Sequence, residues 1–198
     1  MTIIVIEGLD GAGKTTLATK LAEVLGYNYR HYPVDLEAAQ KLHPGKNLDF
    51  YLIIDMLNNP PDPKQNWVVD RYYQSHGAYG GRYCQTLTIA LELTCMLPKP
   101  DFSFLLDVDP LESFNRCAAI GKDTDITVKQ REAIAERYRL DYEWTSVIPG
   151  YMNPLGALKR VYQCLGPHFD LPLWHLTEES VLKPPPPKPR FIYGGRYA

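Results

Sequence analysis

The sequence predicts an α/β fold in which a parallel five-stranded sheet is covered by helices on both faces. Along its 198 residues, short apolar stretches such as 3–6, 67–70 and 102–107 alternate with longer segments of helical spacing. Two of these stretches end on an acid, Asp70 and Asp107. Such ends are typical of buried parallel strands whose carboxyl ends face a ligand.

The first strand runs into a glycine-rich loop, because residues 7–16 read E-G-L-D-G-A-G-K-T-T. The spacing matches G-x-x-x-x-G-K-T of the phosphate-binding P-loop. Its glycines allow backbone N–H groups to point inward at an anion, and the following helix adds its positive end. Lys14 supplies a cation for the outer phosphates and Thr15 a hydroxyl for Mg²⁺. We therefore expect a P-loop NTPase-type fold in which ATP contacts Gly8, Gly11, Ala12, Gly13, Lys14, Thr15 and Thr16.

Apolar residues at helical spacing predict a first helix behind this loop, ending at Gly26. A second strand is predicted over 27–32. Helices are predicted over 34–42 and 48–57, and the proline-rich run 58–65 is expected to be a surface loop.

Residues 71–83 are rich in Tyr, Gly and Arg, which favours a functional loop over a packed helix. A helix over 85–96 leads to the strand over 102–107. Pro110 then occupies a position typical of the first residue of a helix.

Helices over 127–145 and 154–165 and a fifth strand over 171–176 complete the predicted sheet. The tail changes character, since 183–198 begins with a proline-rich run that favours polyproline II. We expect residues 1–182 to be a single domain, followed by an extension that either lies on the surface or docks a partner.

The composition bounds the class of protein. A net charge of −2 gives no indication of a broad nucleic-acid surface, and no stretch approaches the length of a membrane span. The four cysteines form no C-x-x-C pair, which favours scattered thiols over a metal site. We expect an intracellular, cytoplasmic protein.

A second group of motifs narrows the reaction class. In order and spacing over residues 1–180, the chain resembles the thymidylate kinase family of P-loop nucleoside monophosphate kinases. The motifs that carry the resemblance are the P-loop, D-R-Y-Y-Q-S at 70–75, A-Y-G-G-R at 78–82, P-D-F-S-F-L-L-D-V at 100–108 and Arg139-Leu140-Asp141-Tyr142. The resemblance implies that ATP, with Mg²⁺, phosphorylates a small-molecule deoxynucleoside monophosphate, with dTMP to dTDP as the leading reaction.

The resemblance also implies residue roles. Asp70 would hold Mg²⁺ with Thr15, while Arg71 would contact the acceptor monophosphate and Asp10 would approach the acceptor side. A Tyr79 ring against the sugar would leave no room for a 2′-hydroxyl. The residues alone also allow an exposed Asp70–Arg71 ion pair and a packed aromatic at Tyr79.

Further residues are assigned to the acceptor and to a lid. Ser75 and Tyr142 lie in the family's motifs, and Phe50 or its neighbour Tyr51 would stack on the base, unless these aromatics belong to the core. Residues 116–126 occupy the place of the lid, where Arg116 and Lys122 are its cations or else solvated surface charges. Family members often have an arginine where this chain has Ile120, and Arg131 or Arg137 would compensate.

Two departures concern the acceptor. The segment Tyr32-Pro33-Val34-Asp35 lacks the family's arginine after the proline, with Arg30 just before it, and Met56 replaces a typical arginine near the base. A thioether donates no hydrogen bond to a base carbonyl.

Both dTMP and a modified deoxynucleotide therefore remain candidates for the acceptor. The first alternative function is a P-loop kinase that acts on a deoxynucleoside or a DNA-borne hydroxyl. The second alternative is a nucleotide-binding module without catalytic activity. Altered substrate residues in a compact chain are also expected of a virus-encoded kinase. Because the family is commonly homodimeric, the helices over 48–57 and 85–96 are candidates for a dimer interface, or for burial within one chain.

Overall fold

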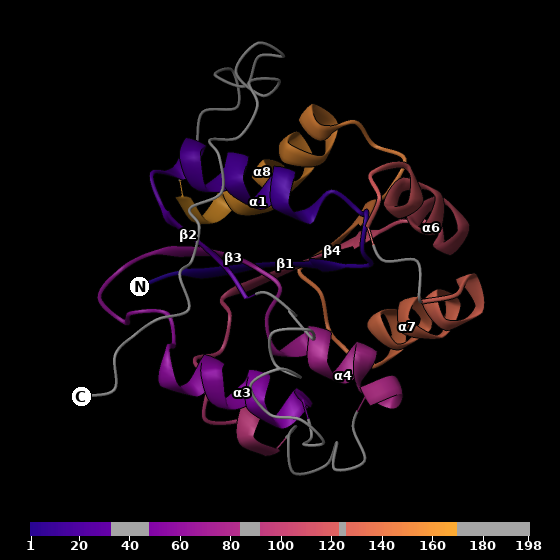
Figure 1. Ribbon diagram of the computed structural model, residues 1–198. Helices are drawn as coiled ribbons and strands as arrows, with labels where there is room; N and C mark the ends of the chain where they lie inside the picture. The colour runs from indigo at the N-terminus through magenta and orange to yellow at the C-terminus, as the bar shows by residue number, and fades with distance from the viewer. Residues whose placement is uncertain (33–47, 84–91, 123–125, 170–198) are drawn as a thin grey trace.

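The structure is a computed structural model that describes residues 1–32, 48–83, 92–122 and 126–169, apart from the side chains of 48–52 and 81–83. Over these residues, five parallel strands form one sheet in the order β2-β3-β1-β4-β5 (Figure 1). The strands are β1 (Ile3–Gly8), β2 (Asn28–His31), β3 (Trp67–Asp70), β4 (Phe102–Asp107) and β5 (Ser146–Pro149). The predicted α/β fold is confirmed.

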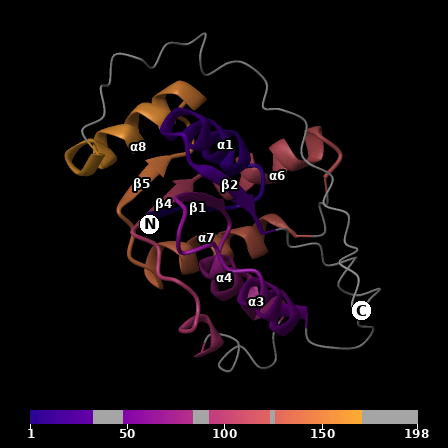
Figure 2. The ribbon, with the colours of Figure 1, turned by 90° about the vertical axis from the view of Figure 1, so that its left-hand side faces the viewer.

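Helices cover both faces of this sheet. They are α1 (Lys14–Leu25), α3 (Leu48–Asn58), α4 (Tyr73–Tyr83), α6 (Pro110–Ala119), α7 (Val128–Leu140) and α8 (Pro154–Phe169). Helices α1 and α8 lie on one face and α3, α4 and α7 on the other (Figures 1 and 2). Helix α6 lies near the end of the sheet where β1 and β4 finish (Figure 1).

The central strand β1 is buried on both sides. Ile4 and Ile6 belong to the hydrophobic cluster that includes α1 and α8, whereas Ile3 and Val5 belong to a second cluster with Met56. Successive side chains of a strand point to opposite faces. A continuous apolar run is therefore what a strand between two helical layers requires.

Several predicted boundaries are confirmed. Strands β3 and β4 have the predicted ends, and Gly26 caps α1 in a left-handed conformation with φ of 65°. Pro110 begins α6 after Asp109, whose carboxylate accepts hydrogen bonds from the N–H groups of Leu111 and Glu112. The two helix boundaries depend on a local signal, either a glycine or a proline with an N-cap residue.

The strand beside β4 is β5 at Ser146–Pro149, where no strand was predicted, and the predicted strand over 171–176 lies outside the described residues. Helix α7 also ends at Leu140, five residues before the predicted end. Only four residues long, β5 carries a weak pattern, and it ends in a proline. That proline is tolerated because β5 is an edge strand, where a missing N–H breaks no ladder.

The interpretation of residues 71–83 as a loop was also wrong, since α4 occupies Tyr73–Tyr83. The Glu7 carboxylate accepts hydrogen bonds from the N–H groups of Tyr72 and Ser75. These two groups lie at the start of α4, where the Tyr72 N–H has no other acceptor among the described residues and the Ser75 N–H is shared with the carbonyl oxygen of Tyr72. A residue of β1 thus provides the cap that the local sequence lacks.

Some predicted elements lie outside the described residues. These are the helix over 34–42, the segment 171–176 and the extension over 183–198, together with most of the helix over 85–96, of which residues 92–94 are described and helical. Among the described helices, none combines the length and apolar character needed to cross a bilayer.

Candidate active site

The loop between β1 and α1 presents a helix N-terminus without a side-chain cap. Gly8, Gly11 and Gly13 have positive φ angles of 143°, 73° and 92°. A Cβ at Gly8 would lie 2.5 Å from the carbonyl oxygen of Leu106, so β1 and β4 can approach each other here only with a glycine. Gly13 precedes α1 and makes no side-chain cap. The first N–H groups of α1 are therefore available to an anion.

Lys14 is folded back onto this loop. Its Nζ donates to the carbonyl oxygen of Leu9 at 2.6 Å, and the residue is buried. Burial and the charge of Arg71 lower the pKa of Lys14 to about 8, against the opposing effect of carboxylates such as Asp10. A polyphosphate at the loop would stabilise the charged form of this lysine.

Asp70 at the end of β3 meets Thr15 in the first turn of α1. The Thr15 hydroxyl donates to Asp70 Oδ2 at 2.6 Å, and Asp70 is fully buried. Its Oδ1 is also buried and has no hydrogen-bond partner among the residues described. Burial by itself would raise the pKa of Asp70, but the contact with His31 and the charge of Lys14 outweigh it and hold the pKa below the usual range.

This pair of oxygen-bearing groups fits Mg²⁺, a hard cation that prefers oxygen ligands. The part of the chain that the structure describes contains no group of three or more His, Cys, Asp and Glu residues that could hold a metal alone. Mg²⁺ is commonly bound by one or two protein groups together with substrate phosphates and water. Thr15 and Asp70 would hold it in that way beside a nucleotide.

Arg71 follows β3 and turns its side chain toward the glycine-rich loop. Its φ is 67°, a left-handed conformation that costs a non-glycine residue about 1–3 kcal/mol. The guanidinium pairs with the Asp10 carboxylate and donates to Ser75 Oγ at 3.1 Å, and the residue is buried. The ion pair therefore links Arg71 to the loop rather than to the neighbouring Asp70.

Tyr79 on α4 contacts both members of this ion pair. Its hydroxyl donates to Asp10 Oδ2 at 3.1 Å, and the Arg71 guanidinium lies 5.2 Å from the ring centroid. Burial raises the pKa of the Tyr79 phenol, which therefore stays protonated and serves as a donor. Burial would also raise the pKa of Asp10, but the charge of Arg71 reverses the shift and keeps it an anion. The ring is thus both packed and part of the site.

Glu7 lies behind Arg71 and was not selected from the sequence as a site residue. Besides two backbone N–H groups, its carboxylate accepts from Ser75 Oγ at 2.6 Å and from the Tyr138 hydroxyl at 3.1 Å. The predicted acceptor residue Ser75 is buried and bonds to both Glu7 and Arg71. A charged residue at the end of an apolar strand was the signal that could have identified Glu7.

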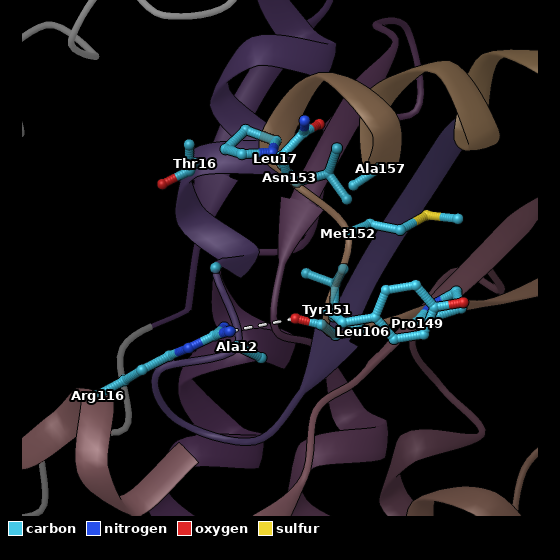
Figure 3. Close-up of a pocket in the computed structure, with 13 residues that line it drawn as sticks. Ala12, Thr16, Leu17, Leu106, Arg116, Pro149, Tyr151, Met152, Asn153 and Ala157 are labelled. Atoms are coloured by element: carbon cyan, nitrogen blue, oxygen red, sulfur yellow. Dashed lines mark hydrogen bonds between the residues drawn. The ribbon is translucent and has the colours of Figure 1, made fainter. Parts of the chain in front are cut away.

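A cavity of about 380 Å³ opens beside the loop, between α1 and the segment that follows β5. Ala12 and Gly13 line one side, and Arg116 points into it from α6 (Figure 3). Arg116 Nη2 donates to the carbonyl oxygen of Gly150 at 3.2 Å, while Nε pairs with Glu112 at 2.7 Å. A largely apolar cavity next to an anion site suits the base of a nucleotide.

The other cations considered for the lid lie elsewhere. Lys122 is exposed after α6, and residues 123–125 of the lid segment lie outside the described residues. Arg131 is buried and donates to Ser113 Oγ at 3.0 Å, and Arg137 donates to a backbone carbonyl of α4 at 2.8 Å. Both of these arginines are engaged within the protein.

The remaining residues proposed for the acceptor are less closely connected. Tyr142 is partly buried against the hydrophobic core, and Met56 is buried in the cluster below β1. The Phe50 side chain lies outside the part of the chain that the structure describes. Arg30 places its guanidinium 4.7 Å from the ring centroid of Tyr32 and donates from Nη1 to the carbonyl oxygen of Pro60 at 3.4 Å.

Comparison with known proteins identifies relatives over most of the chain. The family model for thymidylate kinase matches residues 57–146. The probable thymidylate kinase of Archaeoglobus fulgidus is 34% identical over 181 residues, covering 79% of this chain and 90% of that protein. The probable thymidylate kinase of Staphylothermus marinus is 32% identical over 171 residues, covering 75% and 83%.

Solved structures share the fold. Deoxyadenosine kinase from M. mycoides with bound dCTP superposes with a TM-score of 0.63 at 18% identity, over 84% of this chain and 100% of that chain. The same kinase with bound dATP gives a TM-score of 0.62 at 19% identity, with the same coverage.

Proposed function

Because this chain belongs to the thymidylate kinase family, and so is a nucleoside monophosphate kinase, we propose that it transfers the γ-phosphoryl group of ATP to a deoxynucleoside monophosphate. The leading acceptor is dTMP, which would give dTDP and ADP. Residues 1–182 would form the kinase domain.

One observation carries the proposal: two buried cations, Lys14 and Arg71, both meet the glycine-rich loop between β1 and α1. Lys14 Nζ donates to the carbonyl oxygen of Leu9, and the Arg71 guanidinium pairs with the Asp10 carboxylate. A donor polyphosphate and an acceptor phosphate at this loop would each pair with one of the two cations, and a kinase for monophosphates needs both phosphate groups.

Different residues of the chain would bind the donor phosphates, the base of ATP and the Mg²⁺ ion. The backbone of Gly8–Gly13 and the N-terminus of α1 would bind the donor phosphates, while Arg116 and the cavity beside it would bind the base of ATP. Bound Mg²⁺, held by Thr15 and Asp70, would neutralise charge on the transferring group. Lys14 and Arg71 would hold the two phosphates in line from opposite sides.

The transfer itself needs no general base, because the attacking atom is an oxygen of the acceptor phosphate that is already anionic. That oxygen forms a bond to the γ-phosphorus as the bond from the γ-phosphorus to the β–γ bridging oxygen breaks, and the electron pair leaves with ADP. The barrier is lowered by positioning and by charge neutralisation. On the acceptor side, Tyr79 would lie against C2′ of the sugar and select against a 2′-hydroxyl.

The proposal also concerns which base the acceptor nucleotide carries. Met56 replaces a residue able to donate a hydrogen bond, and it is buried in a hydrophobic cluster. A site that lacks a polar contact to the base discriminates less between bases. Acceptance of a modified deoxynucleotide beside dTMP is therefore part of the proposal.

The test is an ADP-release assay with ATP and Mg²⁺ across the nucleoside monophosphates, their deoxy forms and the free deoxynucleosides. We expect dTMP or another deoxynucleoside monophosphate to stimulate ADP release above the rate without acceptor. Stimulation by deoxynucleosides alone would replace the proposed acceptor class. No stimulation by any monophosphate would reject the proposed reaction.

A further inference from the structure

Three side chains converge on one oxygen of Asp70. Oδ2 lies 2.6 Å from Thr15 Oγ1, 3.2 Å from the Tyr29 hydroxyl and 3.1 Å from His31 Nδ1. The other oxygen, Oδ1, is buried with no hydrogen-bond partner in the described part of the chain. The carboxylate is thus held on one side and free on the other.

Strand β2 brings two of these groups into place. It pairs in parallel with β3 so that His31 lies opposite Asp70 and Tyr29 opposite Val68. Residues two apart on a strand point to the same face, so Tyr29 and His31 both flank the end of β3. This edge of the sheet lies beside α1, which carries Thr15 (Figure 1).

An aspartate side chain can rotate about its Cβ–Cγ bond, and contacts to one oxygen restrict that rotation. The Tyr29 hydroxyl donates to Oδ2. His31 Nδ1 lies 3.1 Å from the same atom without forming a hydrogen bond to it or to any other described group, and an imidazole that carries its hydrogen on Nδ1 would donate to Oδ2 after a small rotation. With Oδ2 held in this way, Oδ1 has a defined direction. Partners that orient a metal ligand commonly change metal affinity by about 10–100-fold when they are removed.

We propose that Tyr29 and His31 are positioning residues that orient Asp70 for the Mg²⁺ that accompanies ATP, an inference that rests on the proposed function. Neither residue would touch the nucleotide or the metal. His31 is the more informative position because 29% of its side chain is exposed. Replacement of the His31 side chain therefore disturbs little of the core packing.

The experiment measures ATP binding by isothermal titration calorimetry, in Mg²⁺ and again in EDTA, without any acceptor. His31→Leu should weaken binding about 10–100-fold in Mg²⁺ and leave binding in EDTA unchanged. Tyr29→Phe, which removes only the hydroxyl, should act in the same direction. His31→Asn should restore binding in Mg²⁺, since its amide nitrogen can donate from a position close to that of Nδ1.

The controls separate this inference from the proposed function. Wild-type binding of ATP that does not depend on Mg²⁺ would reject the metal site and the inference with it. A Mg²⁺-dependent wild type with unaffected His31→Leu and Tyr29→Phe variants would overturn the inference and leave the function standing. Equal weakening in Mg²⁺ and EDTA, or a matching fall in the urea midpoint without rescue by His31→Asn, would show a structural role instead.

Discussion

Replacement of Glu7 tests whether a carboxylate from β1 assembles the acceptor half of the site. Glu7 is fully buried and accepts four hydrogen bonds, two from backbone N–H groups at the start of α4 and two from hydroxyls. Glu7→Ala removes every acceptor. Glu7→Gln keeps one side-chain oxygen as the acceptor for the two N–H groups and replaces the other oxygen with an amide NH₂. The Ser75 and Tyr138 hydroxyls can accept hydrogen bonds from that NH₂ group.

The expected magnitudes follow from these partners. A buried donor left without a partner costs about 1–3 kcal/mol, and the Tyr72 N–H would be such a donor in Glu7→Ala, whereas the Ser75 N–H keeps the carbonyl oxygen of Tyr72 as an acceptor at 3.1 Å. We therefore expect a loss of about 1–3 kcal/mol in the free energy of unfolding for Glu7→Ala. Glu7→Gln exchanges hydrogen bonds rather than deleting them, and a loss within about 1.5 kcal/mol is expected. Urea unfolding followed by tryptophan fluorescence measures both values. The exposed substitution Glu132→Gln is the matched control.

The direction of the pKa shift of Glu7 predicts how the stability difference between Glu7→Gln and the wild type changes with pH. Burial raises the pKa of Glu7 above its ordinary value of 4.5, although the charge of Arg71 acts against the shift. The folded protein then binds the proton more tightly than the unfolded chain. Stability contributed at this position therefore falls as the pH rises from about 4.5 through the raised pKa. Glutamine has no such titration.

Glu7→Gln should accordingly compare more favourably with the wild type at pH 8 than at pH 5, while Glu132→Gln shows no such trend. A difference between Glu7→Gln and the wild type that is constant with pH would refute the assigned pKa direction. A loss below about 1 kcal/mol in Glu7→Ala would refute the role of Glu7 as the cap of α4.

Two further substitutions address the acceptor side. Arg71→Ala should lower kcat by about 10²–10³-fold, because one charge on the transferring phosphate is lost, while ATP affinity measured by calorimetry is retained; loss of ATP binding would place Arg71 on the donor instead. Tyr79→Ala should raise the ratio of kcat/KM for the ribonucleotide over the deoxynucleotide by about tenfold or more, whereas Tyr79→Phe keeps the ring and should leave the ratio unchanged; an unchanged ratio in Tyr79→Ala would remove Tyr79 as a sugar filter.

Much of the proposed donor half of the site could be located from the sequence. Gly8, Gly13, Lys14 and Thr15 lie within one continuous segment, and their geometry depends on local backbone rules and on the strand and helix that flank them. Asp70 was predictable because a buried apolar strand ends on it. These are short-range signals, whereas the contact of Thr15 with Asp70 joins residues that lie 55 positions apart in the chain.

The acceptor half could not be predicted in the same way. Helix α4 was interpreted as a loop because its glycines and tyrosines give a weak helical signal, and its cap comes from a residue 65 positions earlier. The position of Arg71 depends on a left-handed backbone and on Asp10, 61 positions earlier. The contacts of His31 and Tyr29 with Asp70 arise only when β2 and β3 pair in register.

The sequence by itself therefore determined the α/β class, the anion-binding loop and the family, because each is encoded by residues close together in the chain or by motifs in a regular order. Only the tertiary structure decided which strand lies beside β4 and which groups hold Arg71, Tyr79 and Asp70. The hydrogen bonds of these three residues with Asp10, Thr15 and Tyr29 join groups that lie 41 to 69 positions apart in the chain. Their energies depend on burial and pairing, which no local pattern specifies.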